Sequence, residues 1–201
     1  ITPESYDCTT LYVGAMGNGR FILGEDGRAV PFAGDDFLAV PPKTLCGTST
    51  DIGMIYTEII LKKENTILNN IIKAGQPTAL KDLISYEEGS IANVDLVHAD
   101  NMKFVLMAFD AGTSLPPHRA PGNAILTALE GKAIIGYEGQ DYELTADQSF
   151  RFDKNGLHSV TAQGKFKMSL LLVLAETTLL DCTASTSSLS SDSSKVRLAS
   201  Q

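Results

Sequence analysis

Short apolar runs rich in β-branched and aromatic residues dominate the sequence, and Gly, Asp or Pro separates one run from the next. Clear examples are residues 103–109, 124–129, 132–137 and 166–173. Short strands that alternate with turn residues are typical of all-β sandwiches and barrels. We therefore predict an all-β fold.

Helical patterns are confined to the middle of the chain, at residues 67–73 and 80–84, and Pro77 separates the two segments. A proline cannot continue a helix, because it lacks a backbone N–H and its ring clashes with the preceding turn. We expect these two segments to form a connector and not a helical domain.

The chain also shows an internal repeat. When it is shifted by 112 residues, residues 18–27 fall on residues 130–139 with three glycines coinciding, and Cys46 falls on His158. Self-similarity at a fixed period indicates repeated structural units, so we predict two copies of one β unit. Copy one starts at the position equivalent to Thr113 and is expected to lack front strands. Its open strand edges then need cover from copy two or from a second chain.

This repeat predicts three regions. A partial repeat is expected over residues 1–66, and a complete barrel over residues 67–178. Residues 179–201 are rich in Ser and form the third region. Because this last segment has few apolar residues to bury, we expect it to be a flexible extension.

Composition excludes several classes of partner. The net charge of -8 argues against nucleic acid or an anionic membrane surface. The longest apolar run, residues 170–175, is far too short to span a membrane. The three cysteines are widely spaced and include no C-x-x-C pair. Such a pattern favours a reducing compartment, and hence a cytoplasmic location, over a disulfide-stapled secreted domain.

Two motifs lie in copy two. The first has the spacing G-x5-H-x-x-x3-x-x6-G, and its positions are Gly112, His118, Ala120, Ala124 and Gly131. The second runs from Asp147 to Ala162 and contains His158. The spacing of the first motif resembles that of the cupin superfamily. In the second motif only His158 is identical to the family pattern, and residues 144–152 resemble the family's usual run into that site. In that family a second histidine and a glutamate stand where this chain has Ala120 and Ala124.

The resemblance covers roughly 110 residues of copy two and implies a double-stranded β-helix, a jelly-roll barrel whose mouth holds the ligand site. Several phrases of copy two look like small bacterial cupin-domain proteins of unassigned function. Copy one looks like the rear part of another such domain, which would make the chain bicupin-like.

The resemblance also implies where a metal would bind. The four ligand positions of the family correspond to His118, Ala120, Ala124 and His158, so two imidazoles remain. Zinc, nickel, iron and manganese sites typically use three or more protein ligands. Two alternatives therefore remain. Either His118 and His158 bind a metal ion, or the site is degenerate and binds none.

In copy one the 112-residue shift places Tyr6, Cys8, Tyr12 and Cys46 at the same four positions. No histidine is present, so we expect these residues to pack or to line a small pocket. Cys8 and Cys46 are placed where they can face each other, but buried cysteines are usually inert.

Three functions remain open. The first is a small-molecule binding protein, with a sugar or organic acid held by His118 and His158. Its candidate wall residues are Phe104, Met107, Tyr137, Phe150 and Phe152. The second is a metal-dependent isomerase, lyase or dioxygenase that uses the same two histidines. The third is a structural scaffold that oligomerises, most simply as a homodimer. All three exclude nucleic acid and membrane partners.

Overall fold

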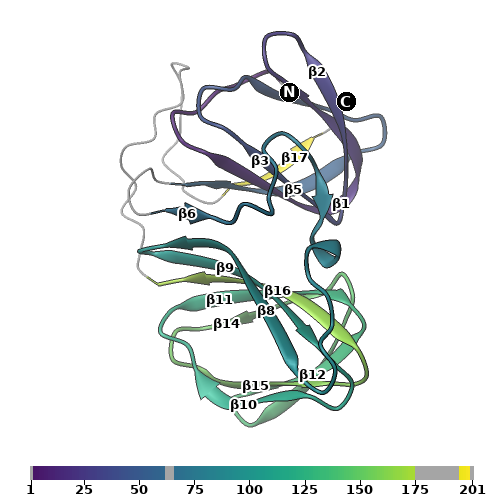
Figure 1. The fold of residues 1–201 in the computed structure, drawn as a ribbon, viewed down its shortest axis with the longest axis vertical. Helices are drawn as coiled ribbons and strands as arrows, with labels where there is room; N and C mark the ends of the chain where they lie inside the picture. Colours follow the sequence, from purple (N-terminus) through teal and green to yellow (C-terminus); the bar gives the residue numbers. More distant parts are fainter. Residues whose placement is uncertain (1, 62–65, 175–194, 200–201) are drawn as a thin grey trace. The chain divides into compact units, whose positions relative to one another are not determined.

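The structure is a computed structural model that describes residues 2–61, 66–174 and 195–199. Within these residues every regular element is a β-strand, apart from the single 3-10 turn η1 (Leu80–Leu83) (Figure 1). The all-β prediction is therefore confirmed. Two compact units divide the chain. Unit 1 consists of Ile1–Thr66, Asn70–Ala79 and Thr177–Gln201, and unit 2 of Ile67–Asn69 and Leu80–Glu176.

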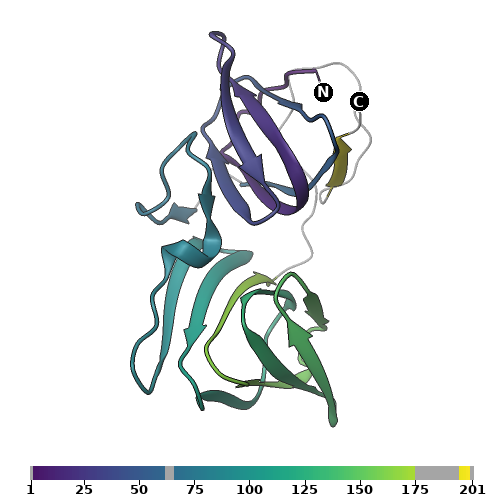
Figure 2. The ribbon, with the colours of Figure 1, turned by 90° about the vertical axis from the view of Figure 1, so that its right-hand side faces the viewer.

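Unit 2 has two antiparallel sheets that curl around one apolar core (Figures 1 and 2). Its strands are β6 (Ile67–Leu68), β8 (Ile91–Ala99), β9 (Met102–Phe109), β10 (Ser114–Arg119), β11 (Asn123–Glu130), β12 (Lys132–Tyr137), β13 (Gln140–Thr145), β14 (Ser149–Phe152), β15 (Leu157–Ala162) and β16 (Phe166–Val173). One sheet has the strand order β10-β15-β12-β13, and the other β14-β11-β16-β9-β8-β6. This is the predicted jelly-roll barrel.

Side-chain alternation explains the core of unit 2. In β11 the side chains of Ala124, Leu126 and Ala128 are buried, and the residues between them are more exposed. Successive side chains of a strand point to opposite faces of the sheet, so one face of β11 lines the barrel. Ala133 and Ile135 of β12 do the same in the opposite sheet.

Unit 1 is built around one long strand, β1 (Thr10–Leu23). Its other strands are β2 (Arg28–Ala33), β3 (Asp36–Val40), β4 (Cys46–Ser49), β5 (Met54–Ile60), β7 (Thr78–Ala79) and β17 (Lys195–Ala199). The first part of β1 pairs with β3 and β5, and its last part pairs with β2 and β4. In unit 2 two strands share this role: β11 pairs with β14 and β16, and β12 pairs with β13 and β15.

The strand register shows that the shift between the two units is 114 residues over β1, two more than the 112 predicted from the sequence. Leu23 pairs with Arg28 and with Cys46, and Tyr137 pairs with Gln140 and with His158. Cys46 and His158 differ by 158 − 46 = 112, but Leu23 and Tyr137 differ by 137 − 23 = 114. The turn after β1 has four residues, 24–27, and the turn after β12 has two, 138–139. The sequence comparison aligned the glycines of these turns instead of the strands.

One glycine in each unit has the backbone conformation that the 114-residue shift requires. Gly17 and Gly131, 114 residues apart, have φ angles of 77° and 78°. A Cβ atom on Gly17 would lie 2.2 Å from the carbonyl oxygen of Gly53, and one on Gly131 would lie 2.0 Å from that of Lys165. Only glycine fits such a close approach at positive φ.

The connector and the tail differ from the expectations in detail. Residues 67–73 were expected to be helical, which is wrong: Ile67–Leu68 forms β6, and the residues after it form turns. Ile67 and Leu68 pair with β8, and this pairing outweighs the local preference for a helix. The flexible extension expected over residues 179–201 falls mostly outside the described residues. Lys195–Ala199 lies within them and forms β17.

Among the described residues, no helix has the length and apolar character needed to cross a membrane.

Candidate functional site

Two histidines face each other across a strand pair of unit 2. His118 of β10 is paired with His158 of β15, just after an irregularity in β10 between Leu115 and His118. Their ring centroids lie 4.2 Å apart, and the planes are tilted by 54°. The structure therefore brings together the two residues that the sequence motifs singled out.

Backbone carbonyls fix the tautomer of both rings. His118 Nδ1 lies 2.9 Å from the carbonyl oxygen of Pro116, and His158 Nδ1 lies 2.9 Å from that of Gly156. A carbonyl oxygen only accepts hydrogen bonds, so each Nδ1 is the donor. A ring with its proton on Nδ1 alone presents a lone pair at Nε2, which accepts a hydrogen bond or binds a metal ion.

The two rings differ in their surroundings. His158 is buried and stacks on Phe152, with ring centroids 4.2 Å apart at 23°. His118 is exposed. Burial lowers the pKa of His158, the hydrogen bond to Gly156 opposes this, and the nearby charge of His118 lowers the pKa further. The lowered pKa favours the neutral form of His158.

Aromatic rings continue from His158 into the barrel. Phe152 lies 5.2 Å from Phe150 and 5.7 Å from Tyr137, and Phe150 lies 5.6 Å from Tyr137, all between ring centroids. Tyr142, which the sequence did not single out, lies 5.1 Å from Phe150. The structure places Tyr137, Phe150 and Phe152 beside the histidine pair as one connected cluster.

The other two candidate wall residues lie elsewhere on β9. Met107 packs against the core cluster of the barrel. Phe104 is three residues away and thus on the opposite face of the strand. It is buried opposite Leu171 and Val97. Phe104 does not join the aromatic cluster next to His158.

Charged side chains near the pair are themselves paired. Arg119, beside His118, donates to the backbone carbonyl of Asn155 and lies 3.7 Å from a carboxylate oxygen of Glu138. Arg151 lies 2.8 Å from Asp153. The two guanidinium groups nearest in sequence to the site thus each lie within ion-pair distance of a carboxylate.

The second and third ligand positions, which hold alanines, offer no side-chain ligand to a metal. Ala124 is buried in the core cluster. Ala120 offers only its carbonyl oxygen, which accepts from the backbone N–H of Asn155 at 2.8 Å. In the described ranges no group of three or more His, Cys, Asp or Glu residues is arranged to hold a metal ion. Two imidazoles alone do not provide the usual set of three protein ligands.

Unit 1 has a different set of residues at the equivalent place. Glu4 forms an isolated bridge with Cys46, as His118 pairs with His158. The backbone N–H of Lys43 donates to Tyr6, as that of Asn155 donates to Ala120. In the corrected register the four positions are therefore Glu4, Tyr6, Thr10 and Cys46. The earlier assignment of Tyr6, Cys8 and Tyr12 to the first three positions is wrong, because it carried the two-residue slip.

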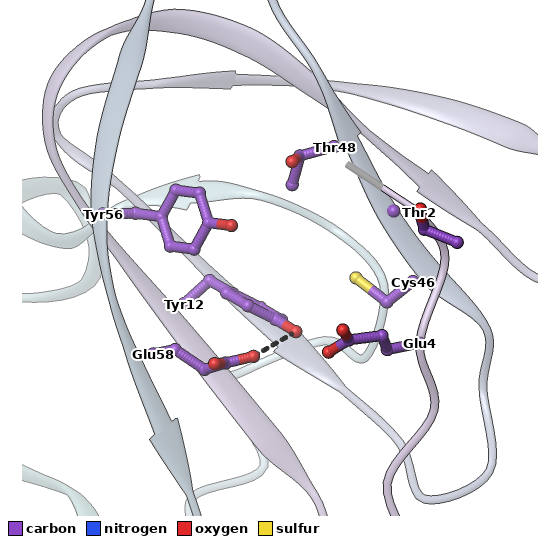
Figure 3. A pocket seen from close by; sticks show the side chains of 8 residues that line it. Thr2, Glu4, Tyr12, Cys46, Thr48, Tyr56 and Glu58 are labelled. Atoms are coloured by element: carbon purple, nitrogen blue, oxygen red, sulfur yellow. Dashed lines mark hydrogen bonds between the residues drawn. The ribbon is translucent and has the colours of Figure 1, made fainter. Parts of the chain in front are cut away.

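A small polar pocket surrounds this place, as Figure 3 shows. Its volume is about 10 Å³, the size of one water molecule. The Tyr12 hydroxyl donates to buried Glu58 at 3.0 Å. Burial raises the pKa of Tyr12, and the neighbouring Cys46 and Glu58 raise it further. Sequence reasoning missed Glu4 and Glu58, since only the pairing of β1 with β5 brings Glu58 to Tyr12.

The cysteines of unit 1 do not form a pair of free thiols. Cys46 is a buried free thiol, whereas Cys8 is disulfide-bonded. The expectation that Cys8 and Cys46 face each other as thiols is not met, and the cysteines no longer support a cytoplasmic location.

Comparison with known families identifies part of unit 2. Residues 105–174 match the family model described as "Cupin domain". A search of curated proteins found no match.

Solved structures resemble a larger part of the chain. A "Cupin 2 conserved barrel domain protein" from Leptotrichia buccalis has a TM-score of 0.73 and 26% identity over 86% of this chain and 77% of that one. A salicylate 1,2-dioxygenase from Pseudoaminobacter salicylatoxidans has a TM-score of 0.61 and 11% identity over 86% of this chain and 66% of that one. A cupin superfamily protein from Desulfitobacterium hafniense has a TM-score of 0.52 and 23% identity, covering 54% of this chain and 99% of the other.

Proposed function

This chain carries a cupin domain, and from that premise we propose that the domain binds a small molecule, a sugar or an organic acid, at His118 and His158. Unit 1 is proposed to be a second domain of the same kind without histidines, which would make the protein bicupin-like. The proposal needs no metal ion.

The observation that carries the proposal is the opposed pair of imidazoles beside an aromatic cluster. Both Nδ1 atoms are held by backbone carbonyls, which leaves the lone pair of each Nε2 as the ring's acceptor for a ligand. Tyr137 and Phe150 supply apolar surface next to them. Binding sites for small molecules typically combine an apolar wall with a few well-placed polar groups.

Proton NMR of the metal-free full chain tests this directly, because the chain has only three histidines. Neutral sugars, uronates and organic acids are titrated in turn. We expect one class to shift the ring signals of His118 and His158 in a saturable way, and to leave those of exposed His98 unmoved. A His118→Ala variant should lose binding, and a matched His98→Ala variant should keep it. If no compound of any class moves either ring, the proposed binding function is wrong.

A metal-dependent isomerase, lyase or dioxygenase is the second candidate. The availability of Nε2 on two adjacent rings favours it, and the fold is shared with a salicylate 1,2-dioxygenase. The donor set counts against it, since among the residues that the structure describes no third His, Cys, Asp or Glu is arranged with the two imidazoles to hold a metal ion. Elemental analysis of protein purified without an affinity tag distinguishes the candidates. A full equivalent of Zn, Ni, Fe or Mn would favour the enzyme.

Rebuilding the ligand set tests the positions themselves. An Ala120→His/Ala124→Glu double variant should gain metal binding, because it restores the two residues of the family motif. The matched control is Ala120→His alone, which adds one imidazole without the carboxylate and should bind more weakly. A double variant that stays metal-free in excess nickel would show that the ligand positions are misassigned.

A further inference from the structure

One strand of unit 1 comes from a distant part of the sequence. β17 (Lys195–Ala199) pairs antiparallel with β5 (Met54–Ile60), with Ala199 opposite Met54 and Lys195 opposite Glu58. It lies at the end of its sheet, where β5 is its single partner among the described strands. Residues 61–194 separate the two strands in the chain.

The equivalent place in unit 2 is filled by β9. β5 pairs with β1 as β16 pairs with β11, so β5 and β16 are counterparts. The other side of β16 pairs antiparallel with β9, and the other side of β5 pairs antiparallel with β17. The pairs Met54↔Ala199 and Phe166↔Phe109 stand at equivalent positions, since 166 − 54 = 112. In the sequence, β9 comes directly before the strands of the barrel that it completes. β17 comes after the strands of unit 1, and the whole of the barrel lies between them in the chain.

The edge that β17 covers belongs to the core of unit 1. Met54, Tyr56 and Glu58 of β5 are buried. A bare edge at such a strand would leave a row of backbone donors and acceptors without partners in the sheet.

We propose that the outer edge of β5 is a strand-binding site and that the segment Lys195–Ala199 is its detachable ligand, bound by backbone pairing. The ligand is an extended peptide in which the basic residues Lys195 and Arg197 alternate with the aliphatic residues Val196 and Leu198. Adding a strand to a sheet edge is a common mode of peptide recognition, in which backbone hydrogen bonds supply the affinity. The proposal is independent of the His118–His158 site.

The test uses the full chain with a protease site inserted between Ser187 and Ser188. After cleavage, the fragment of residues 188–201 is no longer joined to unit 1. We expect the fragment to co-elute with the body in size-exclusion chromatography, and a fluorescent peptide of the same sequence to exchange with it. A fragment that separates from the body on cleavage would overturn the proposal.

Two matched peptides then test strand pairing against unspecific adhesion. One carries N-methyl groups at Lys195, Arg197 and Ala199, and the other at Val196 and Leu198. An edge strand directs alternate backbone N–H groups to its partner and the others to solvent. One peptide should therefore lose affinity by at least about tenfold, and the other should bind nearly as well as the unmodified peptide. Equal effects of the two modifications would contradict strand pairing.

Discussion

One buried imidazole, that of His158, contributes to the pH dependence of the stability of unit 2. Burial lowers the pKa of His158 below its ordinary value of 6.5. As the pH falls through about 6.5, the unfolded chain takes up a proton that the folded chain refuses, so the folded state loses stability. The loss ends once the pH is below the folded pKa. Above about pH 8 the imidazole is neutral in both states and contributes no pH dependence.

Urea unfolding in metal-free buffer between about pH 5 and pH 8 measures this effect. We expect the free energy of unfolding to fall toward acid pH, and a His158→Gln variant to show a smaller fall. Carboxylates titrate in part of the same range, so the difference between the two proteins isolates the imidazole. His98→Gln is the matched control, because His98 is exposed. Identical slopes for the wild type and His158→Gln would contradict the prediction.

The two site histidines should also differ in their contribution to stability at neutral pH. Replacing His158 by Ala removes a buried ring that stacks on Phe152 and donates to Gly156. We expect a loss of about 2 kcal/mol in the free energy of unfolding. His118→Ala alters an exposed side chain and should cost less than about 1 kcal/mol. Denaturant titrations check this, and equal losses would mean that the burial of His158 is unimportant.

At the scale of the elements, close backbone approach sets the requirement for glycine. Gly131 precedes β12 at φ 78°, and a Cβ atom there would lie 2.0 Å from the carbonyl oxygen of Lys165. Gly131→Ala should destabilise unit 2 by about 3 kcal/mol or more, because the backbone of a core strand has to move. Gly139→Ala is the matched control. Its φ is 84° and no atom lies within 4 Å, so only backbone strain of about 1 kcal/mol is expected. Thermal unfolding of both variants would contradict this account if the two losses were alike.

The strands with the strongest patterns could be predicted from the sequence. The run at residues 132–137 coincides with β12, and that at residues 166–173 coincides with β16. The segment at residues 67–73 could not, because its conformation depends on pairing with β8, some thirty residues away in the chain. The same holds for β17, where a short alternating segment after a Ser-rich stretch becomes a strand by pairing with β5.

At the scale of the whole molecule, the repeat shows which features of the two units could be predicted from the sequence. Matching glycines led to the prediction of two related units, but the turns after β1 and β12 differ by two residues in length, and the glycines align with the turns and not with the strands. His118 and His158 were found because motif spacing within one unit is local. Glu4 and Glu58 were not, because their positions follow from strand register, which no local pattern contains. The proximity of the two histidines in unit 2 could thus be predicted from the sequence, and the residues around the small pocket of unit 1 could not.

We predict that the full chain assembles as a homodimer. Large apolar side chains are strongly exposed in unit 1, among them Met16 at 64% and Ile52 at 77%. Met16 pairs with Ile55 and Gly17 with Met54, so both exposed residues lie at the same end of the β1–β5 pair. Contiguous exposed apolar surface on a folded chain commonly marks a protein contact. Light scattering after size-exclusion chromatography should give about twice the chain mass of 21.5 kDa. A mass of one chain at every concentration measured would contradict the dimer and the scaffold function that depends on it.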